Sequence, residues 1–353
     1  MAIPTPADNL GELSGYHSPQ VDVEVRLNTN ESPFQPPPAW SRRVAEATAS
    51  IDFNRYPDRG YARLRKAIGD QHRIGPDWVF AANGSNEVLQ TLFHTYGGSG
   101  RTAVLFEPTY AMHRQIAYVT GTSVVAGERD DDMRIPLAEA TRVVADASPS
   151  LTFVCSPNNP SGTVEPRETV ETLVGLDAGL VVVDEAYGQF ASWTAADLVD
   201  VEVPLVVTRT YSKTWSMAGL RLGYLIGPPE VVAALDARVL PYHLDALKQE
   251  AGAIALEFRA DMERAVDGIV SERRRVLAAL GGVGVETWDS EANFILFRPR
   301  VVPGDEVWQA LVERSVLVRN CSSWPRLADC LRVTIGTPEE NDRFVDALTE
   351  VLT

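Results

Sequence analysis

The stretch LVVTRTYSKTWSMAGLRLGY, residues 205–224, decides the fold. A short apolar run rich in valine ends in a group of polar residues, which include Lys213, and Arg221 follows a few positions later. A single lysine in a loop is usually a surface residue. A lysine held partly out of water, however, loses its proton readily and becomes a nucleophile. The rest of the sequence must therefore show whether Lys213 is a surface lysine or a reactive one.

The composition restricts the partners of this chain. Its 353 residues carry a formal net charge of −16, whereas binding to nucleic acid or to anionic membranes requires basic patches. We therefore expect neither nucleic acid nor membrane as a partner. The first residues, MAIPTPADNL, lack the pattern of a signal peptide, and no apolar run is long enough to cross a bilayer. These features predict a soluble, cytoplasmic protein.

The cysteines and histidines show no ligand pattern. The three cysteines are odd in number and far apart, which argues against a disulfide framework and against the usual zinc spacings. The five histidines are scattered along the chain as well. The sequence therefore predicts no metal site.

Four short apolar runs indicate an α/β fold. They contain apolar residues on both faces and are separated by longer, partly helix-like stretches, which is typical of buried strands in a parallel sheet. The next run, LRLGYLIG (220–227), begins too soon after Lys213 for a crossover helix, so we expect it to return antiparallel. The four runs are TAVLF (102–106), SLTFVCS (150–156), GLVVVD (179–184) and VPLVVT (203–208).

The pattern changes near residue 230, where long helix-like segments lead into alternating strands at 292–299, 315–320 and 330–335. This mixture predicts a second, smaller α+β domain. We expect an N-terminal arm (1–30) that joins the small domain, a large domain (31–235) with a mostly parallel central sheet flanked by helices, and a small C-terminal domain (236–353).

Polar residues follow each of the four buried strands. Ligands of open parallel sheets bind beyond the carboxyl ends of the strands, so these side chains are expected to converge. Each of them alone is explained by a turn, a helix cap or ordinary packing. Together they indicate a site. They are Tyr110, Asn159 of the PNNPSG segment (157–162), Asp184, Tyr187, Thr210, Ser212 and Lys213.

A further candidate is Gly84-Ser85-Asn86, which lies where the spacing of Val88, Leu89 and Leu92 predicts the start of a helix. Unpaired backbone N–H groups and the helix dipole make such an end a binding site for anions. An ordinary helix cap explains the same residues. The chain contains no GxxxxGK[ST] motif, which argues against a nucleotide-binding P-loop.

These residues, in this order, resemble pyridoxal-phosphate enzymes of the aspartate-aminotransferase fold. Within that group the chain is similar to the histidinol-phosphate aminotransferases, notably the actinobacterial ones, from about residue 16 to the C-terminus. The segments that carry the resemblance include RLNTNESP (26–33), NRYPD (54–58), AANGSNE (81–87), EPTYAMH (107–113), SPNNPSG (156–162), VVDEAYGQF (182–190), TRTYSK (208–213), AGLRLGY (218–224), LPYHL (240–244), ANFILF (292–297), VLVRN (316–320) and LRVTIGTPEEND (331–342).

The resemblance implies roles for these residues around pyridoxal 5'-phosphate. Lys213 would bind the cofactor covalently and move the proton of the substrate, Asp184 would pair with the ring nitrogen, and Tyr110 would stack on the ring. Asn159 and Tyr187 would bond the ring oxygen. The cofactor phosphate would be held by Gly84, Ser85, Asn86, Ser212 and Arg221, with Thr210 as a weaker candidate.

The resemblance also implies a homodimer with shared active sites, in which Tyr56 reaches the cofactor phosphate of the neighbouring subunit. The groups expected to bind the substrate are Tyr16, Asn30, Asn159, Arg319 and Arg332. The implied reaction is transamination between a small-molecule amino donor, glutamate, and a phosphorylated keto acceptor, imidazole-acetol phosphate. Written in the other direction, it converts L-histidinol phosphate and 2-oxoglutarate to these two compounds in histidine biosynthesis.

Two segments depart from the pattern of the family. Residues 245–248 place Asp245 near the expected phosphate pocket, and the loop CSSWPRLADC (321–330) contains a tryptophan. These departures leave open an aromatic or broad-range aminotransferase. A phospho-amino-acid decarboxylase and a non-catalytic pyridoxal-phosphate binder are further alternatives, although the presence of Lys213 and Asp184 disfavours the last.

Overall fold

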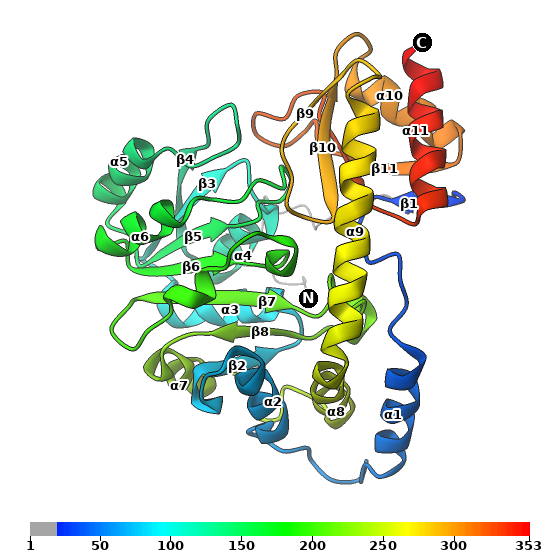
Figure 1. Ribbon diagram of the computed structural model, residues 1–353. Helices are drawn as coiled ribbons and strands as arrows, with labels where there is room; N and C mark the ends of the chain where they lie inside the picture. The colour runs from blue at the N-terminus through cyan, green and yellow to red at the C-terminus, as the bar shows by residue number, and fades with distance from the viewer. Residues whose placement is uncertain (1–19) are drawn as a thin grey trace, which may run out of the picture.

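The structure is a computed structural model, and it describes residues 20–353. Two sheets of different size form the centres of its two parts, and the long helix α9 runs beside both parts (Figure 1). Tyr16 and most of the predicted N-terminal arm lie outside the described residues.

The larger sheet has seven strands in the order β2-β8-β7-β6-β5-β3-β4. The five strands from β7 to β4 are parallel, whereas β8 is antiparallel to both of its neighbours. The predicted antiparallel return after Lys213 is therefore confirmed. The strands are β2 (Val79–Ala82), β3 (Thr102–Glu107), β4 (Ser123–Glu128), β5 (Leu151–Cys155), β6 (Leu180–Asp184), β7 (Leu205–Thr210) and β8 (Gly223–Ile226).

Helices cover both faces of this sheet because its central strands are apolar on both sides. In β3, Ala103 and Leu105 pack with α3 and α4 on one face, whereas Val104 and Phe106 pack with α5 and α6 on the other. The helices of this part are α1 (Pro38–Ala49), α2 (Ala62–His72), α3 (Ser85–Tyr96), α4 (Ala111–Thr120), α5 (Leu137–Ala147), α6 (Arg167–Gly175), α7 (Pro229–Arg238) and α8 (Ala246–Ala255), with 3₁₀ turns at Pro76–Trp78, Gly188–Phe190, Ala195–Leu198, Ala218–Leu220 and Leu256–Phe258.

The smaller sheet has the strand order β1-β11-β12-β10-β9. Strand β1, near the start of the described chain, runs parallel to β11, and the other pairs are antiparallel. Helices α9, α10 and α11 belong to this part. The bounds are β1 (Val25–Leu27), α9 (Arg259–Leu280), β9 (Val285–Thr287), β10 (Phe294–Pro299), α10 (Gly304–Glu313), β11 (Val316–Asn320), β12 (Leu331–Thr334) and α11 (Pro338–Leu352).

The predicted fold class is confirmed: a mostly parallel central sheet between helices, with a smaller mixed sheet beside it. The boundary predicted at 235/236 stays a prediction. Helix α8 lies beyond it and packs against α1 and α2 of the large part, while α9 contacts β9, β10 and the turn at Gly188–Phe190.

Within residues 20–353, no helix combines the length and the apolar character required to cross a membrane. The same residues contain no cluster of three or more histidine, cysteine or acidic side chains that could hold a metal ion. The three cysteines are buried free thiols.

Candidate active site

A cavity opens at the carboxyl ends of the parallel strands and extends to the small sheet. Twelve of the predicted site residues line it, from both parts of the chain. They are Asn30, Ser85, Asn86, Tyr110, Asn159, Asp184, Tyr187, Thr210, Ser212, Lys213, Arg221 and Arg332. Residues far apart in the sequence are therefore gathered into one site, as the strand-end rule predicts.

Lys213 lies just beyond the end of β7, where its Nζ donates a hydrogen bond to the carbonyl of Thr29 at 3.0 Å. Burial, together with the nearby guanidinium groups of Arg332 and Arg221, lowers the pKa of the Lys213 amine to about 7. Glu31 opposes this shift. Near neutral pH this amine is therefore partly unprotonated, which is the state that a nucleophilic lysine requires.

Asp184, the last residue of β6, is 2% exposed and held on both carboxylate oxygens. His113 Nε2 donates to Oδ2 at 2.9 Å, while the backbone N–H of Ala186 and the hydroxyl of Thr208 donate to Oδ1 at 3.1 and 3.3 Å. These bonds fix the position and orientation of the carboxylate. The buried ring of His113 stacks on Phe153 at 5.1 Å between centroids.

The start of α3 forms the end of the cavity suited to an anion. Gly84 precedes the helix with a φ of 89°, a left-handed conformation that favours glycine. A Cβ there would lie 2.8 Å from Arg221 Nη2. Ser212 Oγ accepts hydrogen bonds from Arg221 Nη1 at 3.4 Å and from the Thr210 hydroxyl at 3.0 Å. A guanidinium, hydroxyl groups and a helix N-terminus therefore meet at one place, as phosphate binding requires.

The aromatic and amide groups lie between these charged residues. The hydroxyl of Tyr110, the residue that precedes α4, donates to Asn86 Oδ1 at 3.2 Å. Tyr187 OH accepts from Asn30 Nδ2 at 2.9 Å, and burial raises the pKa of this phenol to about 12. Tyr187 is therefore a neutral hydrogen-bonding group at physiological pH.

Two arginines approach the cavity from the small sheet. Arg319 of β11 and Arg332 of β12 are direct partners in the antiparallel pair, and they are 8% and 4% exposed. Arg332 donates to Asn159 Oδ1 and to the carbonyl of Asn28, so it connects the small sheet with the PNNPSG loop. Arg332 lines the cavity, whereas Arg319 lies behind it, with its guanidinium carbon 5.9 Å from the ring centroid of Trp324.

Three predicted residues within the described part of the chain do not line this cavity. Tyr56 is 81% exposed and stacks on Tyr242 at 4.5 Å between ring centroids. Arg319 is the second, and Gly84 adjoins the cavity through Arg221 without lining it. Tyr16 is outside the described residues.

The pose of Asp245, which the sequence left open, is resolved. Its side chain accepts a hydrogen bond from the backbone N–H of Lys248 at 2.7 Å and caps the start of α8. It also pairs with Lys248 Nζ at 3.1 Å, and its side chain is 59% exposed. Asp245 does not line the cavity, so its charge is not aimed into it.

The sequence assigned no role to three residues that the structure places at the site. His113 holds Asp184, Thr29 accepts from Lys213, and Trp324 lines the cavity beside Arg332. The available signal for His113 was its position in the segment EPTYAMH, about one helical turn after Tyr110. Thr29 and Trp324 depend on contacts between the two parts of the chain, which local patterns do not reveal.

Comparison with known proteins identifies the family. The family model of the class I and II aminotransferases matches residues 22–348. The histidinol-phosphate aminotransferase of Streptomyces avermitilis is 44% identical over 359 residues, covering 98% of this chain and 95% of that protein. The chain belongs to the histidinol-phosphate aminotransferase family. A second member, from Corynebacterium glutamicum, is 40% identical and is covered over 95% of its length.

Solved structures show the same fold. The histidinol-phosphate aminotransferase of Sinorhizobium meliloti, solved in complex with pyridoxal-5'-phosphate, superposes with a TM-score of 0.87 at 21% identity, covering 99% of this chain and 98% of that one. The enzyme from Clostridium acetobutylicum gives 0.86 at 23% identity, covering 93% and 99%. At these identities the likeness concerns the fold.

Proposed function

We propose that this protein catalyses the pyridoxal-phosphate-dependent transamination of L-histidinol phosphate with 2-oxoglutarate, which yields imidazole-acetol phosphate and glutamate in histidine biosynthesis. The full-length relationship to the histidinol-phosphate aminotransferases carries this conclusion. The cavity supports it, because it combines a lysine of lowered pKa, a fixed buried carboxylate and an anion pocket.

The residues present fit pyridoxal 5'-phosphate. The N-terminus of α3, Ser212 and Arg221 are suited to its phosphate, and Asp184 to its ring nitrogen. When bound, the cofactor supplies an electron sink for the negative charge that develops at the substrate Cα. Asn159 and Tyr187 offer neutral hydrogen-bonding groups for the ring oxygen, and Tyr110 offers an aromatic face.

Lys213 has two tasks in this proposal. Its amine would hold the cofactor covalently, since a pKa of about 7 leaves part of it unprotonated. The same amine is placed to take and return the proton at the substrate Cα, as a general base and acid. A group with a pKa near the working pH performs both halves of such a transfer well.

Arg332 is proposed to bind the anionic ends of the substrates, and Arg319, its partner on the neighbouring strand, to add positive charge beside it. 2-Oxoglutarate brings carboxylates and L-histidinol phosphate brings a phosphate, and a guanidinium binds either group through paired hydrogen bonds. Arg332 is kept in place by Asn159 and by the carbonyl of Asn28. Asn30 connects two residues of this region. Its side chain donates to the Tyr187 hydroxyl, and its backbone N–H donates to the Thr334 hydroxyl at 2.9 Å.

We also propose a homodimer with shared sites. Tyr56 does not line the cavity of its own chain, and it stacks on Tyr242 while both remain exposed. Phe53 and Leu240, close to these two residues in the sequence, are exposed as well. Exposed apolar groups of this size usually mark an interface. A second copy of the chain, placed there, would receive Tyr56 at its anion pocket.

The alternatives have less support. Asp245 faces the capped end of α8 and not the cavity, which removes one reason to expect a different substrate. The L-threonine-O-3-phosphate decarboxylase of Porphyromonas gingivalis superposes with a TM-score of 0.79, but at 21% identity this likeness concerns the fold alone.

The decisive experiment incubates the purified protein, loaded with cofactor, with L-histidinol phosphate and 2-oxoglutarate. We expect glutamate and imidazole-acetol phosphate in equal amounts. Phenylalanine in place of L-histidinol phosphate should give a much lower kcat/KM, and no carbon dioxide should form. An enzyme that prefers phenylalanine, or that releases carbon dioxide without a keto product, would contradict the proposal.

A further inference from the structure

Two loops join the parts of the molecule beside the cavity, and we call them the clasp: residues 128–135 of the large part and residues 321–330 of the small part. Arg326 Nη1 donates to the backbone carbonyl of Arg129, and Arg326 Nη2 lies 3.4 Å from Asp131 Oδ1. A second bond crosses the same boundary, since Trp288 Nε1 donates to the carbonyl of Asp131 at 2.9 Å. The loops are therefore joined by directed polar contacts.

Apolar packing strengthens the clasp. Met133 belongs to the large part, is 4% exposed and packs in a cluster otherwise made of small-part residues. Trp324 packs against this cluster as well. Met133 thus inserts beneath the loop that carries Trp324. The other members are Trp288, Leu296, Cys321, Leu327 and Cys330.

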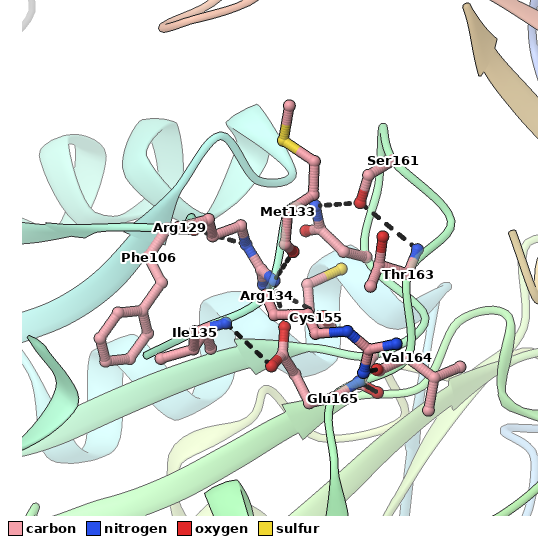
Figure 2. Close-up of polar contacts among 12 residues, drawn as sticks. Phe106, Arg129, Met133, Arg134, Ile135, Cys155, Ser161, Thr163, Val164 and Glu165 are labelled. Atoms are coloured by element: carbon pink, nitrogen blue, oxygen red, sulfur yellow. Dashed lines mark hydrogen bonds and ion pairs between the residues drawn. The ribbon is translucent and has the colours of Figure 1, made fainter. Parts of the chain in front are cut away.

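The large-part half of the clasp is fixed to the strands that position the active site. The Arg129 guanidinium is buried and donates to the carbonyls of Phe106 at 3.1 Å, Met133 at 2.9 Å and Cys155 at 3.4 Å (Figure 2). It also forms a fully buried ion pair with Glu165, whose other oxygen accepts from the Ile135 N–H at 3.1 Å. Phe106 and Cys155 lie near the carboxyl ends of β3 and β5, which lead to Tyr110 and Asn159.

The small-part half carries Trp324 to the cavity. The loop begins two residues after Arg319, and Trp324 lines the cavity with Arg332. Arg326 has a φ of 62°, a left-handed conformation that is unfavourable for a residue with a side chain. Backbone bonds within the loop, such as Leu327 N–H to the Trp324 carbonyl at 3.1 Å, help to hold this conformation, and the bonds of Arg326 to the large part add to them.

We propose that Arg326 is a positioning residue for the substrate-anion end of the cavity. By bonding to the Arg129 carbonyl it holds the Trp324 indole beside Arg319 and Arg332. There the indole excludes water from the two guanidinium groups, and ionic interactions are stronger where water is excluded. The inference rests on the proposed function, because that function assigns the substrate anion to these arginines.

The first experiment compares the cofactor-loaded parent enzyme with Arg326→Ala, Arg326→Lys and Trp324→Ala. We expect Arg326→Ala and Trp324→Ala each to raise the KM for L-histidinol phosphate about tenfold, with kcat changed less than about twofold, since the loss concerns binding. Arg326→Lys should restore part of the affinity. The double variant, Arg326→Ala with Trp324→Ala, should have about the same KM as either single variant, because both changes remove the same placement of the indole beside the arginines.

Arg314→Ala is the matched control. Arg314 also belongs to the small part, donates to a backbone carbonyl and pairs with a carboxylate, that of Glu350. Its side chain is 38% exposed, against 34% for Arg326. Thermal unfolding of all variants shows whether they remain folded, and Arg314→Ala should leave the KM unchanged.

Two measurements keep the test independent of turnover. The fluorescence difference between parent and Trp324→Phe isolates the Trp324 emission. In Arg326→Ala this emission should move to longer wavelength, and acrylamide should quench it more strongly. Inorganic phosphate, titrated into the cofactor-loaded protein, should bind about tenfold more weakly to Arg326→Ala than to the parent. If the parent turns over no L-histidinol phosphate, the proposed function fails. The Trp324 emission and the phosphate affinity still show whether Arg326 positions Trp324.

An unchanged KM and phosphate affinity in folded Arg326→Ala would overturn the proposal. So would a Trp324 emission that is the same with and without Arg326. An effect of Trp324→Ala alone would show that the indole acts without the clasp, which also contradicts the inference.

Discussion

At the scale of single residues, the structure explains why Lys213 is reactive. The amine lies at the end of a buried strand beside two guanidinium groups, and it has a backbone carbonyl as its hydrogen-bond partner in place of a carboxylate. Burial and like charges both favour the neutral form of a lysine. Asp184 differs from Lys213 in its partners, because three hydrogen-bond donors surround its carboxylate and hold it in place.

The lowered pKa of Lys213 predicts a pH dependence of stability in the cofactor-free protein. The amine has a pKa of about 7 when folded and about 10.5 when unfolded, so the unfolded chain binds more protons between these values. The free energy of unfolding should therefore rise with pH over this range. In Lys213→Met this contribution should vanish. The free energy of unfolding of the parent, relative to that of the variant, should therefore rise steadily when both are measured by urea unfolding at pH 7, 8, 9 and 10. A constant difference would contradict the assigned pKa.

His113 should be essential for full activity although it lies behind Asp184. In His113→Phe the Asp184 carboxylate loses its 2.9 Å donor, which corresponds to roughly 1.5 kcal/mol for a charge-assisted bond. We expect kcat to fall about tenfold. His94→Phe is the control, because His94 lies on the exposed face of α3. Steady-state kinetics with equal cofactor occupancy would test this, and an unchanged kcat would show that the other donors suffice.

At the scale of elements, the sequence predicts the central strands because they are apolar on both faces. Both edge strands of the large sheet, β2 and β4, escaped prediction, since β4 is mostly exposed and β2 has only four residues. The start of α3 was predicted from its helical spacing and its Gly-Ser-Asn segment. The sequence therefore reveals the central strands of the large sheet and conceals its edge strands.

The candidate site could be predicted only where the geometry of the sheet determines it. Residues after the ends of successive parallel strands could be placed together because sheet geometry alone brings them together. The contact of Lys213 with Thr29 spans 184 positions, and the approach of Trp324 depends on how the two parts pack. Such contacts arise from tertiary structure and leave no local pattern in the sequence.

The close approach of β8 to α3 predicts the effect of a single methyl group. A Cβ on Gly223 would lie 2.2 Å from the backbone nitrogen of Ser85, and backbone atoms cannot move aside easily. Gly223→Ala should therefore displace the start of α3, weaken cofactor binding at least about tenfold and destabilise the fold by about 1–3 kcal/mol. Gly219→Ala is the matched control, because a Cβ there meets nothing within 4 Å. Cofactor titration and thermal unfolding measure both effects, and equal behaviour of the two variants would contradict the expectation.

At the scale of the whole molecule, the cavity draws its walls from both parts of the chain. The large part supplies the lysine, the carboxylate and the anion pocket, while the small part supplies Arg332 and Trp324. Tyr56 does not line this cavity and is 81% exposed. In the proposed homodimer, site completion would require two levels of assembly, within the chain and between chains.

Mixed dimers test the sharing of sites. Tyr56→Ala and Lys213→Ala should each have little activity alone. Mixing them at equal amounts under conditions that exchange subunits should restore about one quarter of the parental activity, because half of the dimers are then hybrids with one intact site of two. A mixture that is no more active than its components would show that Tyr56 serves its own chain or none.

The pairing of β1 with β11 has a consequence for the synthesis of the protein. Val25 lies opposite Val316, so β1 is synthesised long before its partner strand β11. The Thr29 carbonyl, which accepts the hydrogen bond of Lys213, lies two residues beyond β1. Thr29 therefore cannot be held beside Lys213 through this pairing until β11 has left the ribosome. Nascent chains that stop before β11, although they contain Lys213, should therefore bind pyridoxal 5'-phosphate weakly.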